Sequence, residues 1–126
     1  MNVPSQIKLN KGSRSLELTW PDGHHVELSC ELLRVYSPSA EVKGHGPGQE
    51  VLQVGKKNVT ITELKPVGNY ALQLVFDDGH DTGIYSYDYL LELGEKREKY
   101  WNSYLERMHA AGASRDPDAQ VVRIGL

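Results

Sequence analysis

Two short polar stretches contain the side chains best suited to chemistry. Residues 34–45 read RVYSPSAEVKGH, and residues 77–82 read DDGHDT. If the fold brings these stretches together, their imidazole and carboxylate groups could hold one divalent ion, iron or another metal, because such ions accept nitrogen and oxygen ligands. The four candidate ligands are Glu41, His45, His80 and Asp81. Their spacing matches no established metal motif, so this site is one hypothesis among two.

Hydrogen bonding gives the second interpretation of the same residues. Ser37, Ser39 and Glu41 carry hydroxyl and carboxylate groups of the kind that bond to turn backbone. The same groups could bond to His80 or Arg34. This interpretation needs no metal, and it predicts a loop that is held by its own polar side chains.

Established catalytic motifs are absent from the sequence. It contains neither a G-x-S-x-G nucleophile elbow nor a phosphate-binding G-x-x-x-x-G-K-[ST] loop. The adjacent acids Asp77 and Asp78 fall in a turn-like stretch, where carboxylates commonly bond to backbone amides. We therefore predict that the chain is not an enzyme, with no catalytic residue and no cofactor.

The composition is that of one modest globular domain. The chain has 126 residues, of which 39% are hydrophobic and 25% are charged, and its net charge is -3. This acidic balance argues against nucleic-acid binding. No run of about 18 apolar residues could cross a membrane, and no apolar leader opens the sequence, so we expect a cytoplasmic protein. Cys30 is the single cysteine, which excludes a disulfide within one chain.

Alternating apolar residues predict a first β-hairpin. Residues 15–30 alternate on both sides of a turn at 21–23, and Cys30 falls at the end of the second strand. Ile7 and Leu9 predict a short strand before this hairpin.

A second hairpin is predicted further along the chain. Residues 58–64 and 70–76 alternate, with a turn-like stretch at 66–69 between them. Residues 76–80 then repeat the order of residues 20–24, an aromatic side chain, an Asp-Gly turn and a histidine. Two independent tight turns or a duplicated hairpin would each explain this repeat.

Helical periodicity replaces the alternation near the C-terminus. Ser86 is a plausible N-cap, Gly94 predicts a break, and an aromatic stripe over 97–108 predicts a helix that ends at Gly112. The stripe is interpreted as core, because large rings are buried when a helix crosses a small sheet.

Two segments are predicted to be irregular. Residues 44–55 form a loop, although 50–54 could be a short strand. Residues 113–126 form a tail that is either loose or pairs as an edge strand through Val121, Val122 and Ile124.

These elements predict one α+β domain over residues 1–112, followed by the tail. We expect mainly antiparallel structure with five to seven short strands and a broken C-terminal helix packed on the sheet. The predicted core comprises Leu16, Leu18, Trp20, Val26, Leu28, Leu33, Ile61, Leu72, Leu74, Phe76, Leu90, Trp101 and Leu105.

Four stretches carry a resemblance to a known family. They are WPDG at 20–23, LLR at 32–34, SPSAEVKGHG at 37–46 and PVGNYALQLVFDDGHDTGIYSYDYL at 66–90. With these stretches in order, the chain resembles the gamma-butyrobetaine hydroxylase-like N-terminal domain family over roughly residues 7–110.

The resemblance implies a structural zinc site in some members of the family. Three cysteines of an Arg-x-x-Cys-x-Cys-x-x-Cys run and a later histidine would supply its ligands. Arg34 is in register with that run, but the cysteine positions fall on Ser37, Ser39 and Val42, and only His80 is retained. Hydroxyl groups stay protonated near neutral pH, so this branch, with Ser-Pro-Ser in place of cysteines, is expected to have lost the zinc.

The resemblance also implies a function. In the full hydroxylase, the iron and 2-oxoglutarate chemistry lies in a separate downstream domain, for which this chain leaves no room. We therefore predict a non-catalytic binding or adaptor module that contacts another protein, with a homodimer as one option. The predicted binding surface or loop comprises Arg34, Tyr36, Ser37, Ser39, Glu41, His45, Tyr85 and Asp88, with Tyr87 and Tyr89 adding to its aromatic character.

Similar domains that are fused to Mrp-type P-loop ATPases imply an alternative. The chain would then be a metal-binding or iron–sulfur cluster assembly accessory protein that docks onto a Mrp-type carrier. His80 would be the retained ligand for one iron or zinc ion. Cys30 could supply one thiolate at most, so docking is expected rather than cluster binding.

Overall fold

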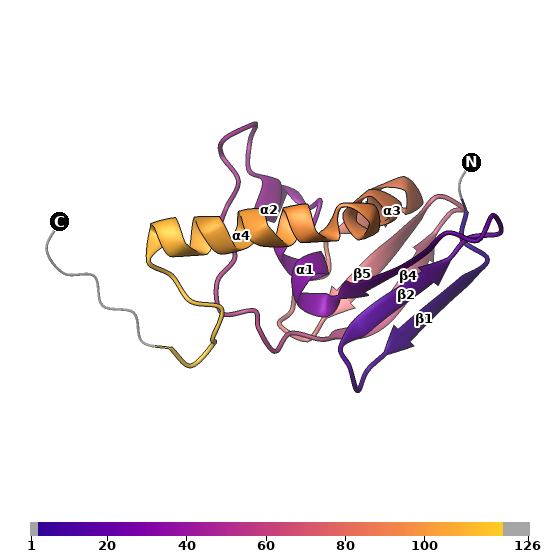
Figure 1. Cartoon of the computed structure of the whole chain (residues 1–126), viewed down its shortest axis with the longest axis horizontal. Coiled ribbons are helices and arrows are strands. Elements are labelled where there is room, and N and C mark those ends of the chain that lie inside the picture. The colour runs from indigo at the N-terminus through magenta and orange to yellow at the C-terminus, as the bar shows by residue number, and fades with distance from the viewer. Residues whose placement is uncertain (1–2, 120–126) are drawn as a thin grey trace, which may run out of the picture.

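The computed structural model describes residues 3–119, which contain two three-stranded antiparallel sheets (Figure 1). The first sheet has the order β1 (Gln6–Asn10), β2 (Ser15–Thr19) and β3 (His25–Ser29). The second has the order β4 (Ile61–Val67), β5 (Ala71–Phe76) and β6 (Ile84–Ser86). Both predicted hairpins and the strand before the first are confirmed, as is the α+β class with mainly antiparallel strands.

Four helices complete the described part of the chain: α1 (Cys30–Val35), α2 (Ala40–Lys43), α3 (Tyr87–Glu95) and α4 (Arg97–Ala111). The sequence-based prediction misses α1 and is wrong to place Cys30 on a strand. A helix of 6 residues is too short to show a periodic signal, and Ser29 starts it by accepting the Leu32 amide at 3.0 Å. Within residues 3–119, no helix is long and apolar enough to cross a membrane.

Each sheet has a turn between its second and third strands, and the two turns have the same hydrogen bonds. In the first sheet, the Trp20 amide donates to the His24 carbonyl at 2.8 Å, and in the second the Phe76 amide donates to the His80 carbonyl at 2.9 Å. In both turns, the aspartate two residues before the histidine accepts the histidine amide. The repeat seen in the sequence is therefore also a repeat of backbone hydrogen bonds.

The repeat continues into the helix that follows each sheet. The amide of Cys30 at the start of α1 donates to Arg14, the residue before β2, and the amide of Tyr87 at the start of α3 donates to Tyr70, the residue before β5. A serine caps each helix. Two independent turns would not share these bonds, so the structure favours a duplicated hairpin.

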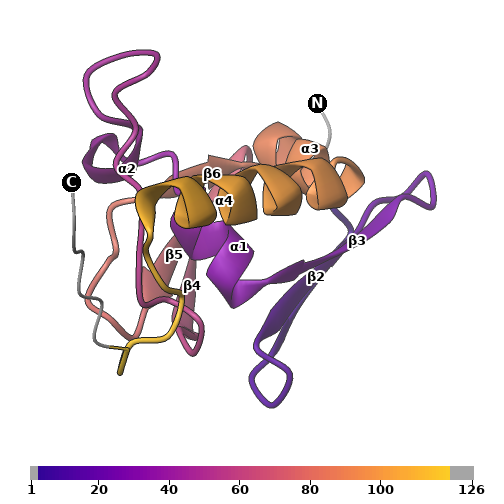
Figure 2. The same cartoon turned by 60° about the vertical axis from the view of Figure 1, so that its left-hand side comes forward.

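The core lies between the two sheets, α1 and α3. Most predicted core residues are confirmed as buried: Leu16, Leu18, Trp20, Val26, Leu28, Leu33, Ile61, Leu72, Leu74, Phe76 and Leu90. Trp101 is only partly buried, and the prediction that Leu105 belongs to the core is wrong because Leu105 is 37% exposed. Figures 1 and 2 show the reason, since α4 runs past the sheets above α1. There Tyr104 and Met108 turn inward and form a second cluster with Val35.

Gly94 has a different role from the predicted helix break. It lies inside α3, and the helix ends after Glu95, with Lys96 between α3 and α4. A Cβ atom at Gly94 would lie 2.4 Å from the Cβ atom of Val26 on β3. The glycine therefore allows α3 to pack closely on the first sheet, as the prediction of a helix on the sheet requires.

The loop predicted for residues 44–55 is confirmed, whereas the turn of the second hairpin differs from its prediction. Residues 50–54 form no strand, although the Val51 amide donates to the Val42 carbonyl at 2.8 Å. The segment after α2 projects from the rest of the chain in both views (Figures 1 and 2). The second hairpin turns at 68–70 rather than at 66–69, because Pro66 still pairs with Leu72 in the sheet.

The first residues of the predicted tail contact the domain. The amides of Gly55 and Lys57 donate to the carbonyls of Ser114 and Arg115, both at 3.0 Å. The predicted edge strand through Val121, Val122 and Ile124 lies outside the described residues.

The close packing at Gly94 gives a stability prediction. Gly94→Ala should lower the free energy of unfolding by about 1–3 kcal/mol through overpacking against Val26. Alanine is the better helix former by roughly 1 kcal/mol, so propensity alone predicts the opposite sign. Urea unfolding of Gly94→Ala, Val26→Gly and the double variant measures the coupling, because glycine at position 26 removes the Cβ atom that the new methyl group would meet. An equal loss with and without the Val26 side chain would contradict the steric explanation.

Candidate functional site

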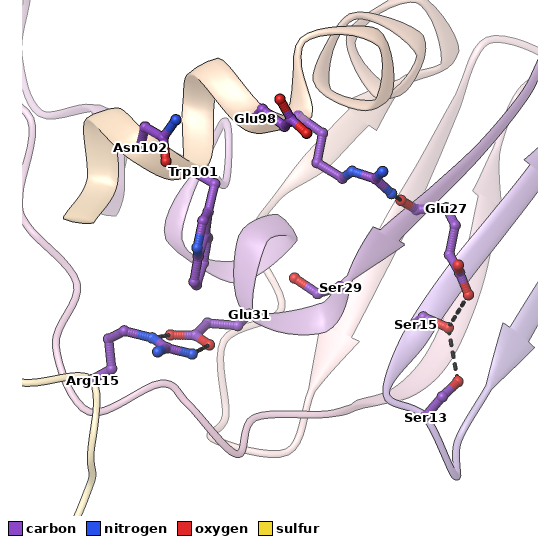
Figure 3. Close-up of a pocket in the computed structure, with 10 residues that line it drawn as sticks. Ser13, Ser15, Glu27, Ser29, Glu31, Glu98, Trp101, Asn102 and Arg115 are labelled. Carbon is purple, nitrogen blue, oxygen red and sulfur yellow. Dashed lines mark hydrogen bonds and ion pairs between the residues drawn. The ribbon is translucent and has the colours of Figure 1, made fainter.

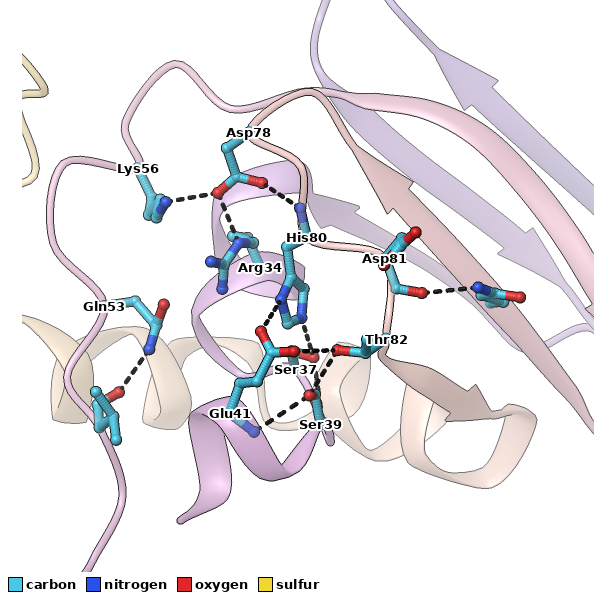
Figure 4. Close-up of polar contacts among 12 residues, drawn as sticks. Arg34, Ser37, Ser39, Glu41, Gln53, Lys56, Asp78, His80, Asp81 and Thr82 are labelled. Atoms are coloured by element: carbon cyan, nitrogen blue, oxygen red, sulfur yellow. Dashed lines mark hydrogen bonds and ion pairs between the residues drawn. The ribbon is translucent and has the colours of Figure 1, made fainter.

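The two polar stretches meet in the structure. Residues 36–43 extend from the end of α1 to the end of α2. They lie beside the turn between β5 and β6, which comprises residues 77–82 (Figure 4). His80 lies at the centre of this contact, and its side chain is 2% exposed. Four residues that sequence analysis selected for chemistry, Ser37, Ser39, Glu41 and His80, therefore lie together across a wide separation in the chain.

Both nitrogens of the His80 ring have partners. Nε2 lies 2.8 Å from Ser37 Oγ, and Nδ1 lies 3.3 Å from a carboxylate oxygen of Glu41. Thr82 donates to the other Glu41 oxygen at 3.1 Å, and its hydroxyl lies 2.8 Å from Ser39 Oγ. These five residues are called the His80 cluster below. The hydrogen bonds that were predicted from Ser37 and Glu41 to His80 are present.

Local backbone structure positions the His80 cluster. Ser39 is the N-cap of α2 and accepts the Glu41 amide at 3.2 Å, while Ser37 accepts the Ser39 amide at 3.3 Å. On the other side, Gly83 leaves the space that Ser37 occupies, since a Cβ atom there would lie 2.5 Å from Ser37 Oγ. Thr82 is a member of the cluster that sequence analysis missed.

Arg34 and Asp78 border the cluster. Arg34 Nε donates to Asp78 at 2.8 Å, and Lys56 donates to the same oxygen. Burial raises the pKa of Asp78, but the hydrogen bonds from Lys56, the His80 amide and Arg34 outweigh it and hold this pKa at about 2. The Arg34 side chain is 9% exposed, and its Nη1 has no hydrogen-bond partner among residues 3–119.

The pKa of His80 is lowered. Burial is the main cause, and the neighbouring Arg34 charge acts in the same direction. The carboxylates of Glu41 and Asp78 oppose these effects without cancelling them. The neutral ring is therefore the form that this site favours.

The order Ser37, His80 and Glu41 is that of a hydrolase triad, but the geometry is unsuited to catalysis. Ser37 is 1% exposed, and its oxygen already accepts the Ser39 amide. A substrate carbonyl carbon must approach a nucleophilic oxygen within bonding distance, and the burial of Ser37 prevents this approach. Glu41, in contrast, is the exposed residue of these three, and 65% of its side chain is accessible to solvent. The triad order here serves to hold α2.

Other residues of the predicted surface lie in different environments. Tyr85 and Tyr87 are buried, and the Tyr85 hydroxyl donates to the Leu33 carbonyl inside the core, so neither is a surface residue as predicted. Their aromatic rings fill space between the second sheet and α1. Asp88 is exposed in the first turn of α3, and His45 is exposed in the segment after α2.

Tyr36 and Tyr89 are half-buried and form the base of a groove. The groove has a volume of about 550 Å³ and lies between α2 and α4. We call it the tyrosine groove; its wall includes Tyr36, Val42, Lys43, Glu50, Val51, Tyr89, Glu92, Tyr100, Ser103 and Arg107. Sequence analysis missed most of this set, although Tyr100, Ser103 and Arg107 share one helix face by their spacing of three and four residues.

A second hollow lies on the other side of α4, between that helix and the first sheet (Figure 3). Its volume is about 650 Å³. Arg115 closes one end with two hydrogen bonds of 2.7 Å to buried Glu31, and its guanidinium lies 4.8 Å from the centre of the Trp101 ring. We call this the Trp101 hollow. Glu31 and Arg115 are thus paired with each other, and Arg97 donates to the backbone carbonyl of Glu27 at 3.0 Å.

An α+β domain with two antiparallel sheets and a polar cluster at the second turn defines the class of protein. Residues 7–91 match the family described as gamma-butyrobetaine hydroxylase-like, N-terminal. The match spans more than half of the sequence, and the chain belongs to this family.

Solved structures support the same assignment. Two NMR solution structures are 48% and 50% identical, with TM-scores of 0.82 and 0.80; the alignments cover 100% of this chain and 99% and 95% of theirs. A crystal structure of a protein with unknown function from Acidithiobacillus ferrooxidans, of the DUF971 family, is 41% identical with a TM-score of 0.61. That alignment covers 72% of this chain and 91% of the other. None of the curated proteins compared with the chain matches it.

The zinc site that the family resemblance implies does not fit the residues present. Ser37 and Ser39 offer only hydroxyl groups, Val42 has no donor atom, and both nitrogens of His80 face protein partners. Among residues 3–119, no three His, Cys, Asp or Glu side chains are grouped so that they could hold a metal ion. His45 and Asp81 therefore do not join Glu41 and His80 in the alternative site that the sequence suggested.

This chemistry predicts that folding is independent of metal. Addition of EDTA should leave the thermal unfolding midpoint unchanged, and elemental analysis should give the same metal content for the natural chain and His80→Ala. Stoichiometric iron or zinc that disappears in His80→Ala would contradict this interpretation.

The lowered pKa of His80 predicts how stability depends on pH. The unfolded chain, with a histidine pKa near 6.5, binds the proton more tightly than the folded chain. The free energy of unfolding should therefore fall as pH falls through 6.5 toward the folded pKa. This loss should be absent in His80→Gln. Asp78 acts in a separate window, between its ordinary 3.8 and about 2.

A control histidine has the opposite sign. The pKa of His24 is raised, first by its hydrogen bond to Asp22, so its contribution is present below 6.5 and is lost as pH rises. Urea unfolding between pH 4.5 and 8, compared between His80→Gln and His24→Gln, should show two slope changes of opposite direction. A His80→Gln profile parallel to that of the natural chain would contradict the assignment.

Proposed function

We propose that this chain is a non-catalytic module that binds another protein through the tyrosine groove. The proposal depends on the hydrogen bonds of three tyrosines in the groove, Tyr36, Tyr89 and Tyr100. Tyr36 donates its hydroxyl to the Tyr100 carbonyl and Tyr89 donates to the Tyr36 carbonyl, both at 2.6 Å. Tyr100 donates to Glu92. Because all three hydroxyl groups have internal partners, the rings are fixed before any partner arrives.

Fixed aromatic walls favour protein binding. The ring centres of Tyr36 and Tyr100 lie 4.9 Å apart, and the rings meet edge to face, which is a stabilising geometry for aromatic pairs. Tyrosine is enriched at protein interfaces, where rigid rings provide contact area at small entropy cost. The exposed Val51 adds an aliphatic contact on the opposite wall. The groove thus combines a rigid floor with an apolar side.

The His80 cluster supports the groove and takes no direct part in binding. Helix α2 carries Val42 and Lys43, which form one wall. A helix of 4 residues has little stability by itself, so its position depends on tertiary bonds. Those bonds come from Glu41 to His80 and Thr82. The cluster that might have been catalytic or metal-binding is, on this proposal, the anchor of a binding wall.

The iron–sulfur alternative receives no support from the described residues. Cys30 is 0% exposed, and burial raises its pKa, so the thiolate needed for a cluster is disfavoured. Docking onto a Mrp-type carrier would be one case of the protein binding proposed above. The homodimer and the cytoplasmic location stay predictions.

Two neighbouring residues of α4 test the proposal. Ser103 is exposed and lines the tyrosine groove, whereas Asn102 is exposed and lines the Trp101 hollow. Ser103→Trp should fill the groove and reduce capture of partner protein from lysate at least about tenfold, which corresponds to roughly 1.4 kcal/mol of binding free energy. Asn102→Trp should leave capture unchanged. Quantitative mass spectrometry of proteins retained on the immobilised chain provides the measurement, and equal capture by both variants would refute the groove as the binding site.

A further inference from the structure

The tyrosine groove is lined by two cations, Lys43 and Arg107, and two carboxylates, Glu50 and Glu92, and the partners of these charges indicate its occupant. Lys43 Nζ lies 5.4 Å from the centre of the Tyr89 ring, and the Arg107 guanidinium lies 5.6 Å from the centre of the Tyr36 ring. Neither cation has an ion pair with any residue between 3 and 119. Each is held over a ring by cation–π attraction, which orients the charge without neutralising it.

The two carboxylates of the groove are already engaged. Glu92 accepts the Tyr100 hydroxyl, and Glu50 accepts the Gly48 amide at 3.0 Å. The first bond joins α3 to α4, and the second lies within the segment after α2; both carboxylates keep their charge and have a hydrogen-bond donor within the domain. The groups that remain available to a ligand are therefore the two cations, together with the apolar surface of Val42 and Val51.

The cations come from opposite walls. Lys43 belongs to α2 and Arg107 to α4, and Tyr36, which follows α1, lines the groove with both of them. A ligand that lies along the groove can meet one cation from each wall while it covers the tyrosine rings. A small anion would satisfy the charges but would leave the rings and the exposed Val51 uncovered.

We propose that the occupant is an extended acidic segment of another protein, in which carboxylate side chains flank an aliphatic one. The carboxylates would form charge-assisted hydrogen bonds with Lys43 and Arg107, and the aliphatic side chain would pack on Val51 and Tyr36. This inference rests on the proposed function, because it names the partner chemistry of the same groove.

Charge recognition of this kind has a clear salt dependence. Screening shortens the range of charge attraction from about 10 Å at 0.1 M salt to about 3 Å at 1 M salt. A segment held only by apolar contact would not be released by salt. Acidic recognition therefore differs from aliphatic recognition in a property that can be measured directly.

Photo-crosslinking of the full chain tests the proposal. Photo-leucine at position 51, which is 52% exposed and lines the groove, should crosslink to a partner segment in lysate. Photo-leucine at position 105, which is 37% exposed and does not line the groove, is the control. Mass spectrometry should identify the segment crosslinked from position 51 as rich in Asp and Glu. The yield should fall at least tenfold in Lys43→Glu/Arg107→Glu, and not in Lys99→Glu.

The identified segment then serves as its own probe. As a labelled synthetic peptide, it should bind the chain at least tenfold more weakly when its carboxylates are replaced by amides, and binding should weaken between 0.1 and 1 M salt. A neutral or basic segment, a segment of a second copy of this chain, or a yield that survives charge reversal would overturn the acidic proposal while leaving protein binding at the groove intact. Crosslinks from position 105 alone would refute both.

Discussion

The buried His80 imidazole is the contact on which the rest of the site depends. A neutral ring can donate from one nitrogen and accept at the other, and its partners assign Nδ1–H to Glu41 and the acceptor Nε2 to Ser37. The remaining bonds then run in one consistent direction: Ser39 donates its hydroxyl to Thr82, Thr82 donates to Glu41, and the Ser39 and Glu41 amides donate to serine oxygens. Every side-chain donor in the cluster has an acceptor, and α2, of 4 residues, is held beside the turn between β5 and β6.

Much of the fold could be predicted because each sheet has one buried face. Side chains at positions such as Leu16, Leu18, Leu72 and Leu74 then alternate in the sequence as they do in space. The failures have a common cause. Leu105 lies on a helix face that would meet a sheet if α4 crossed one, but α4 continues past the sheets and only Tyr104 and Met108 turn inward. The spacing of apolar residues along the sequence predicts neither the extension of α4 past the sheets nor the close approach at Gly94.

The candidate site was predictable to a smaller extent. The family resemblance aligned Ser37, Ser39 and His80 with the ligands of one zinc site. The chemistry of these side chains then indicated hydrogen bonds in place of metal bonds. Thr82 and the tyrosine groove were not predictable in this way, because the neighbours of Thr82 depend on where α2 lies, and the groove depends on how α2 and α4 lie relative to each other. The burial of Tyr85 illustrates the same limit: a tyrosine beside polar residues in sequence can still fill the core when its hydroxyl finds a carbonyl, here that of Leu33.

The internal repeat separates what the fold determines from what the surroundings determine. His24 and His80 end the same turn with the same backbone bonds, yet the His24 side chain is 52% exposed and that of His80 is 2% exposed. The pKa of His24 is raised by Asp22, and the pKa of His80 is lowered by burial. The difference arises because residues 36–43 cover the second turn, whereas His24 remains open beside Asp22 and Glu95. The repeated hairpin thus has two turns with the same backbone bonds, and the covering segment gives the histidines of these turns opposite pKa shifts.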